Sequence, residues 1–180
     1  MDKDKDEKMK EFTISGVSFV PQLWKPKKNL DRLLVYIDEA AKAGAQVIAT
    51  PEGILDGYIT KDLEKNKVRE IDKGSKGYRQ RLARFRKRQI ALACEIRDNG
   101  IPRLCEKAKE HGIYLFANTL DIRRGRSVHN TTFVVDPDGR IIGKYDKIHA
   151  TFEVVNTLGK KHRVFDTPYA PIGVLICADR

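Results

Sequence analysis

The chain has few cysteines and no long apolar run. Its 180 residues include three cysteines, none in a CxxC spacing, so the sequence indicates neither a disulfide framework nor a zinc site. No apolar run approaches the roughly 18 residues of a membrane span, and Met1 to Lys10 lacks the apolar centre of a signal peptide. We therefore expect no membrane partner, a cytoplasmic location and at least one free thiol.

Acidic residues are outnumbered by basic ones. Lys and Arg total 35 against 25 for Asp and Glu, which gives a formal charge of +10. Such an excess can mark a nucleic-acid or anionic partner. Much of it is concentrated in Lys76 to Arg88, which reads as one basic amphipathic helix. A solvated helix face explains this run more simply, so we expect no nucleic-acid partner.

The order of apolar and polar segments predicts an α/β protein. A charged tail over 1–11 precedes a domain over 12–180, with a basic insertion around 59–93. Within the domain, Phe12 to Val20 reads as a strand, Leu30 to Ala43 as a helix capped by Asn29, and Ala45 to Thr50 as a buried parallel strand. This order predicts a strand-helix-strand unit.

The second half continues the alternation. Arg103 to His111 has helical spacing and Ile113 to Ala117 reads as a strand. Thr131 to Val135 and Arg140 to Tyr145 flank an Asp-Pro-Asp-Gly sequence, which is a strong hairpin signal. We therefore expect a mixed sheet with helices.

Three chemically reactive residues follow predicted strands. Glu52 comes after the second strand, where catalytic groups collect in α/β sheets, although a solvated loop acid is the simpler interpretation of a lone glutamate. Lys147 follows the hairpin, and Cys177 follows Val174 to Ile176, which reads as a buried strand. We expect all three strands to belong to one sheet. A carboxylate can accept a thiol proton, and an ammonium group favours the thiolate and stabilises an oxyanion.

Three ordered sequence blocks resemble the signature regions of the nitrilase superfamily of carbon-nitrogen hydrolases. They are VIATPEGILDGY, GKYDKIH and FDTPYAPIGVLICADR. The resemblance extends from about Phe12 to Arg180, apart from Ile59 to Ala93. It implies an α/β fold of the αββα sandwich type and a catalytic triad of Glu52, Lys147 and Cys177.

The resemblance also implies a reaction. Cys177 would attack a carbonyl or nitrile carbon, with Glu52 as general base, while Lys147 and the backbone N–H of Ala178 hold the oxyanion. Water would then hydrolyse the thioester. The implied activity is hydrolysis of non-peptide carbon-nitrogen bonds in a small linear amide or N-carbamoyl compound, or in a nitrile. The ending Cys-Ala-Asp-Arg favours the amidase and carbamoylase branches. No metal or cofactor is implied, and a homo-oligomer is expected.

The chain departs from the family pattern in three places. Asp146 stands where the family commonly has arginine, and Glu153 is the one acid available for the supporting glutamate that many members carry after the lysine block. Family members also continue well past the cysteine. We therefore expect the C-terminal part of the fold to be missing, which leaves an inactive or incomplete fragment as an alternative.

Two further alternatives stay open. Cys177 could pair with His149 or His162 in a Cys/His hydrolase, which would not need Glu52. The segment from Lys76 to Arg88 could instead make the chain an anion-binding or nucleic-acid-binding module. It contains only two aromatic residues, too few for a stacking platform.

Overall fold

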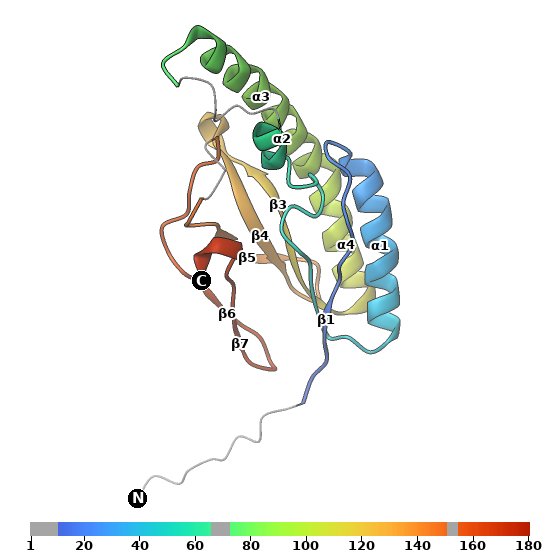
Figure 1. The fold of residues 1–180 in the computed structure, drawn as a ribbon. Helices are drawn as coiled ribbons and strands as arrows, with labels where there is room; N and C mark the ends of the chain where they lie inside the picture. The colour runs from blue at the N-terminus through green and yellow to red at the C-terminus, as the bar shows by residue number, and fades with distance from the viewer. Residues whose placement is uncertain (1–10, 66–72, 151–154) are drawn as a thin grey trace, which may run out of the picture.

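A computed structural model describes residues 11–65, 73–150 and 155–180. Its centre is a five-stranded mixed sheet in the order β1-β2-β3-β4-β5 (Figure 1). The strands β1 and β2 pair in parallel, as do β2 and β3, while β3, β4 and β5 are antiparallel neighbours. The bounds are Ile14–Gly16 for β1, Val47–Ala49 for β2, Tyr114–Ile122 for β3, Val128–Val135 for β4 and Ile141–Asp146 for β5.

The predicted alternation of strands and helices is confirmed, with different boundaries. The strand-helix-strand unit and the hairpin around Asp-Pro-Asp-Gly are both present. The first strand is much shorter than predicted, because only Ile14–Gly16 finds ladder partners on β2. The third is longer than predicted, because β3 pairs along its length with β4.

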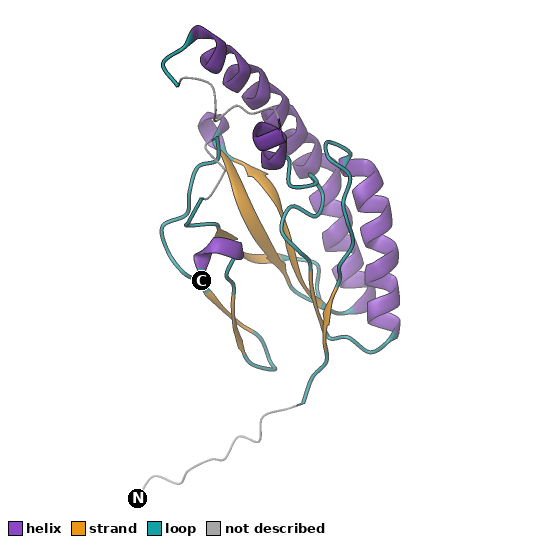
Figure 2. Cartoon of the chain, in the orientation of Figure 1, coloured by secondary structure: helices purple, strands orange, loops and turns teal. Residues whose placement is uncertain are grey.

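Helices cover one face of this sheet (Figure 2). They are α1 (Pro26–Lys42), the short α2 (Thr60–Lys65), α3 (Lys76–Glu95) and α4 (Ile101–His111), with a π-helical turn over Ile96–Gly100 that joins α3 to α4. Gly112 ends α4 in the left-handed conformation, as its position after the apolar spacing predicts. Within the described residues, no helix combines the length and apolar character needed to cross a membrane.

Asn29 does not cap α1, which begins at Pro26. Proline is favoured in the first helical turn because its fixed φ suits the helix and its missing N–H is not needed there. Asn29 is instead buried inside the helix, where its amide donates to the carbonyls of Gln22 and Leu55 and accepts from the Gln22 N–H. These bonds hold the helix against the segments that contain Gln22 and Leu55.

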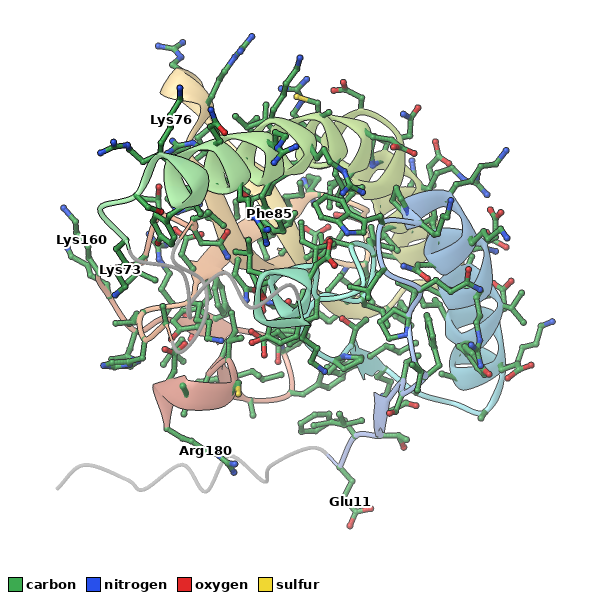
Figure 3. All side chains as sticks on the ribbon, turned by 45° about the horizontal axis from the view of Figure 1, so that its top comes forward. Glu11, Lys73, Lys76, Phe85, Lys160 and Arg180 are labelled. Carbon is green, nitrogen blue, oxygen red and sulfur yellow. The ribbon has the colours of Figure 1, made fainter. Side chains whose placement is uncertain are left out.

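The basic segment contributes α2 and most of α3, and α3 extends beyond the sheet (Figure 1). The helix α3 buries Phe85, while its charged residues are exposed, including Lys76 at the far end (Figure 3). Ser75 caps the helix by accepting a hydrogen bond from the Tyr78 N–H at 3.1 Å. The predicted amphipathic helix is therefore present.

The two faces of the sheet bury two separate apolar clusters. On β3, Leu115 and Ala117 pack with the helices, whereas Phe116 faces the other way and packs with Phe165 and Ile176. This alternation follows from the period of two along a strand. The second cluster lies between the five-stranded sheet and a two-stranded ribbon of β6 (Val164–Asp166) and β7 (Pro171–Gly173). Helices, sheet and ribbon are thus stacked in the order expected for an αββα sandwich.

Candidate active site

Glu52 and Lys147 meet in an ion pair. The Lys147 ammonium donates to Glu52 Oε1 at 2.7 Å, and the lysine side chain is 1% exposed. Glu52 follows β2 and Lys147 follows β5, so the sheet brings together residues 95 positions apart. A buried ammonium needs a partner, because an uncompensated buried charge costs roughly 3–5 kcal/mol.

Two asparagine amides fix the orientation of this carboxylate. Asn130 Nδ2 donates to Glu52 Oε1 at 2.7 Å, and Asn118 Nδ2 donates to Asn130 Oδ1 at 3.0 Å. Asn118 itself accepts from the Gly53 N–H at 2.7 Å, next to Glu52 in the chain. Lys147 and Asn130 therefore both donate to the same carboxylate oxygen, Oε1.

Cys177 begins a 3₁₀ turn over Cys177–Asp179, and the residue is exposed rather than buried. Its φ is +50°, in the left-handed region that a non-glycine residue rarely adopts. The preceding Ile176 is 4% exposed and anchors the segment in the second apolar cluster. A residue held in a strained backbone conformation beside an anchored neighbour is typical of functional sites.

Glu52 and Cys177 line the same cavity of about 360 Å³, which lies between the sheet and the ribbon. Apolar side chains make up much of its wall, and Asn118 and Thr132 add polar groups. Within the described part of the chain, Cys177 makes no hydrogen bond to Glu52 or Lys147. The structure therefore joins two of the three predicted residues directly and places the third in the shared cavity.

The prediction that all three residues follow strands of one sheet is wrong. Glu52 and Lys147 follow strands of the five-stranded sheet, whereas Cys177 lies beyond β7 of the ribbon. Val174 to Ile176 is not a strand, and Leu175 within it is 56% exposed. The apolar run signals burial in this segment, but only Pro171–Gly173 finds ladder partners, on β6.

The charged neighbours of Lys147 in the sequence bind other residues. Asp146 does not pair with Lys147; it binds the guanidinium of Arg123 at 2.7 Å and accepts from Thr131 at 2.8 Å. Lys144 pairs with Asp121 at 3.1 Å. The supporting residue Glu153 lies outside the described residues.

A buried carboxylate beside Cys177 escaped the sequence analysis. Asp179 accepts the Tyr145 hydroxyl at 2.6 Å and the backbone N–H groups of Ile148, His149 and Ile176. Burial alone would raise the pKa of Asp179, but the Tyr145 hydroxyl and the backbone donors outweigh it and hold that pKa below its usual value. Burial and the same hydrogen bond raise the pKa of Tyr145. The position of Asp179 two residues after Cys177 was the available signal in the sequence. The groups that bind its carboxylate are brought to it by tertiary contacts, so the sequence does not identify them.

Neither histidine offered as an alternative partner bonds to the thiol among the described residues. His149 Nδ1 lies 3.2 Å from Asp179 Oδ1, and the His162 ring stacks on Tyr145 with centroids 6.4 Å apart. Of the three candidate bases, only Glu52 is among the described residues that line the cavity shared with Cys177.

A cluster of Asp38, Glu110 and His111 joins α1 to α4 and resembles a metal site in composition. The ammonium of Lys107 lies within it, 2.6 Å from Asp38 and 2.9 Å from Glu110. His111 Nε2 is also 2.6 Å from Asp38. A cation already neutralises these carboxylates, so the cluster is an ion-pair network between two helices.

The fold and site define a mixed α/β protein with an ion-paired glutamate and a presented thiol at one cavity. A family model described as carbon-nitrogen hydrolase matches residues 16–180. The chain belongs to the carbon-nitrogen hydrolase family, within the nitrilase superfamily.

Curated relatives and solved structures agree with this assignment. The chain is 31% identical to omega-amidase NIT2 of Xenopus tropicalis, over 95% of this chain and 56% of the relative. It is 30% identical to a nitrilase of Pyrococcus abyssi, over 92% of this chain and 55% of the relative. An amidase structure from Nesterenkonia sp. superposes with a TM-score of 0.67 at 18% identity, covering 92% of this chain and 55% of the other. The chain thus spans about half the length of these relatives.

Proposed function

We propose that the protein hydrolyses non-peptide carbon-nitrogen bonds of small linear amides or N-carbamoyl compounds, with nitriles as a further substrate class. The observation that carries this proposal is the Glu52–Lys147 ion pair at a cavity also lined by Cys177. Two of the relatives are an omega-amidase and a nitrilase, which agrees with amide or nitrile chemistry.

The proposed reaction begins with proton transfer. Glu52 Oε2 takes the thiol proton of Cys177, and the sulfur attacks the substrate carbonyl carbon. The negative charge that forms on the oxygen is stabilised by the Lys147 ammonium and by the backbone N–H of Ala178. Glu52 returns the proton to the leaving nitrogen, and the carbon-nitrogen bond breaks to release ammonia or an amine.

The second half of the reaction regenerates the thiol. A water molecule gives a proton to Glu52 and attacks the thioester carbon, and the carbon-sulfur bond then breaks. The proton moves to the departing sulfur, so the enzyme returns to its starting state and a carboxylic or carbamic acid leaves. The apolar walls of the cavity lower the local dielectric and so strengthen the interaction of Lys147 with the oxyanion.

The test is release of ammonia from a panel of amides, N-carbamoyl compounds and nitriles, combined with intact mass for the acyl adduct. We expect Cys177→Ala to lose both turnover and adduct, and Cys105→Ala, a matched thiol replacement away from the cavity, to keep both. Glu52→Gln is expected to lose turnover because it cannot accept a proton. Retained turnover in Glu52→Gln would instead favour a Cys/His enzyme.

Absence of both turnover and adduct from the unmodified chain would support the alternative of an incomplete or inactive hydrolase. Oligomerisation is proposed from the resemblance alone, and sedimentation measures it directly.

One observation on the basic segment supports the anion-binding alternative. Five cations of α3 are exposed and make no ion pair with the described residues: Lys76, Arg79, Arg84, Arg86 and Lys87. Steeply salt-dependent binding to duplex DNA or RNA, lost when Arg84 and Arg86 become glutamine, would support this alternative. Binding that is absent at 150 mM salt would leave a solvated helix face.

A further inference from the structure

The carboxylate of Asp179 joins two segments of the chain, 145–149 and 176–180. Its side chain is fully buried, and it accepts hydrogen bonds from the Tyr145 hydroxyl at 2.6 Å and from the N–H of Ile176 at 3.3 Å through Oδ2. Its Oδ1 accepts from the N–H groups of Ile148 at 3.0 Å and His149 at 2.7 Å. These donors fill the acceptor sites of an ionised carboxylate, which has no hydrogen to donate.

The joined segments are those that carry the proposed nucleophile and the proposed oxyanion cation. Asp179 lies two residues after Cys177, and Ile148 lies directly after Lys147. The first segment lies beyond the ribbon and the second extends the five-stranded sheet. The buried carboxylate therefore ties a residue beyond one sheet to a residue beyond the other.

The same carboxylate supports a strained backbone. Cys177 has a φ of +50°, a left-handed conformation that is unfavourable for a residue with a Cβ. Two hydrogen bonds close the turn around Cys177. The Ile176 N–H donates to Asp179 Oδ2, and the Asp179 N–H donates to the Ile176 carbonyl at 3.2 Å. A turn closed on both sides keeps the thiol and the N–H of Ala178 in one orientation.

We propose that Asp179 is a positioning residue, whose buried carboxylate fixes the Cys177 turn relative to the Lys147 segment, so that the thiol meets the carbon of a substrate carbonyl while the oxyanion N–H and the ammonium meet its oxygen. The inference rests on the proposed function for its catalytic consequence, but the connection between the segments can be measured by itself. A displacement of about 1 Å at such a site can cost 10²-fold in rate.

The decisive variant is Asp179→Asn, with Asp166→Asn as its control. Asparagine keeps the shape of Asp179 but replaces one acceptor oxygen with a donor, which then faces the Tyr145 hydroxyl and the Ile176 N–H. Asp166 is exposed on β6, so its replacement makes the same charge change without these contacts. We expect Asp179→Asn to lower kcat roughly 10²-fold with KM within about threefold, and Asp166→Asn to leave both unchanged.

Hydrogen exchange measures the connection without a substrate. In Asp179→Asn we expect faster exchange in two separate segments, 145–149 and 176–180, with unchanged protection in β3. If Asp179→Asn loses protection in both segments but the unmodified chain shows no turnover, the connection between the segments is supported and the proposed function is rejected. Turnover that is equal in the unmodified chain and in Asp179→Asn would reject the positioning role and keep the function.

A third variant covers the case in which Asp179→Asn fails to fold. Tyr145→Phe removes one donor and leaves the carboxylate with its three backbone partners. We expect a smaller loss of kcat, about tenfold, and partial loss of protection in both segments. Unchanged kcat and exchange in a folded Tyr145→Phe variant would overturn the inference, and so would loss of protection in only one of the two segments.

Discussion

At the scale of single residues, the orientation of Glu52 depends on side chains far away in the sequence. Asn130 lies 78 positions from Glu52, and Asn118 lies 65 positions from Gly53, yet the two amides form one continuous set of hydrogen bonds around the carboxylate. The fixed amide of Asn118 also fixes which end of Asn130 faces Glu52. An amide with a fixed orientation donates without rearranging during the reaction.

We expect Asn130→Ala to lower kcat/KM by about tenfold or more, since a hydrogen bond to a charged group contributes roughly 1.5–3 kcal/mol. Lys147 would still pair with Glu52, so the fold should be retained. Steady-state kinetics on the best amide of the panel measures the effect, with the exposed Asn99→Ala as the matched control. Equal kcat/KM in the two variants would show that Lys147 alone orients the carboxylate.

The proposed reacting residues have local signals in the sequence that the residues around them lack. Glu52, Lys147 and Cys177 lie within short ordered motifs, and their chemistry is legible from residue type. Asp179 and Asn130 carry no comparable local signal, because their partners come from other strands and turns. Asp146 shows the same dependence on distant partners, since it binds Arg123 and Thr131 and not the adjacent Lys147.

At the scale of elements, the ribbon that precedes Cys177 is seated on the sheet by close contact at a glycine. A Cβ on Gly143 of β5 would overlap Cε1 of Phe165 on β6. Phe165 also packs edge-on against Phe116 of β3, with ring centroids 6.3 Å apart. Only a residue without a side chain at position 143 lets this ring lie between the two sheets.

We expect Gly143→Ala to destabilise the protein by about 1–3 kcal/mol, the usual cost of overpacking a core. The matched control is Gly173→Ala on β7, where a Cβ meets nothing within 4 Å. Urea unfolding gives the difference, and thiol labelling shows whether Cys177 becomes more accessible. Equal midpoints for the two variants would mean that the ribbon shifts without cost.

Element types followed from sequence more reliably than element ends. The helix stop at Gly112 and the hairpin around Asp-Pro-Asp-Gly are local events, governed by one φ value or one turn. The length of β3 depends on pairing with β4, and the short strand before Cys177 depends on pairing with β6. Pairing partners distant in sequence leave no mark in the local pattern, so these boundaries were wrong.

At the scale of the whole molecule, several groups with shifted pKa values link folding to pH, and His129, Asp38 and Asp56 are three of them. Burial lowers the pKa of His129, and the hydrogen bond from Lys107 lowers that of Asp38. Burial raises the pKa of Asp56, whose carboxyl is bonded to Thr119 and to the Ile59 N–H. Stability falls with falling pH wherever the unfolded chain binds more protons than the folded one.

The three groups act in different pH windows. Unfolded His129 takes up a proton near its ordinary pKa of about 6.5, while the folded residue does not, so this group lowers stability as pH falls through that value. Asp38 acts in the same direction at lower pH, because its carboxylate is protonated first in the unfolded chain. Asp56 opposes them: the folded state binds its proton first, so this contribution is gained as pH falls through the raised pKa and lost as pH rises.

We therefore expect the free energy of unfolding to decrease from pH 7.5 to 5, and His129→Gln to flatten this decrease. The imidazole of His129 is 8% exposed, so charging it inside the fold is costly, whereas glutamine has no proton to gain. Urea unfolding at four pH values in this range gives the slope, with the exposed His162→Gln as control. An equal slope of unfolding free energy against pH in the two histidine variants would assign the acid sensitivity to other groups. A steeper slope in Asp56→Asn would show that the Asp56 carboxyl opposes the loss of stability as pH falls.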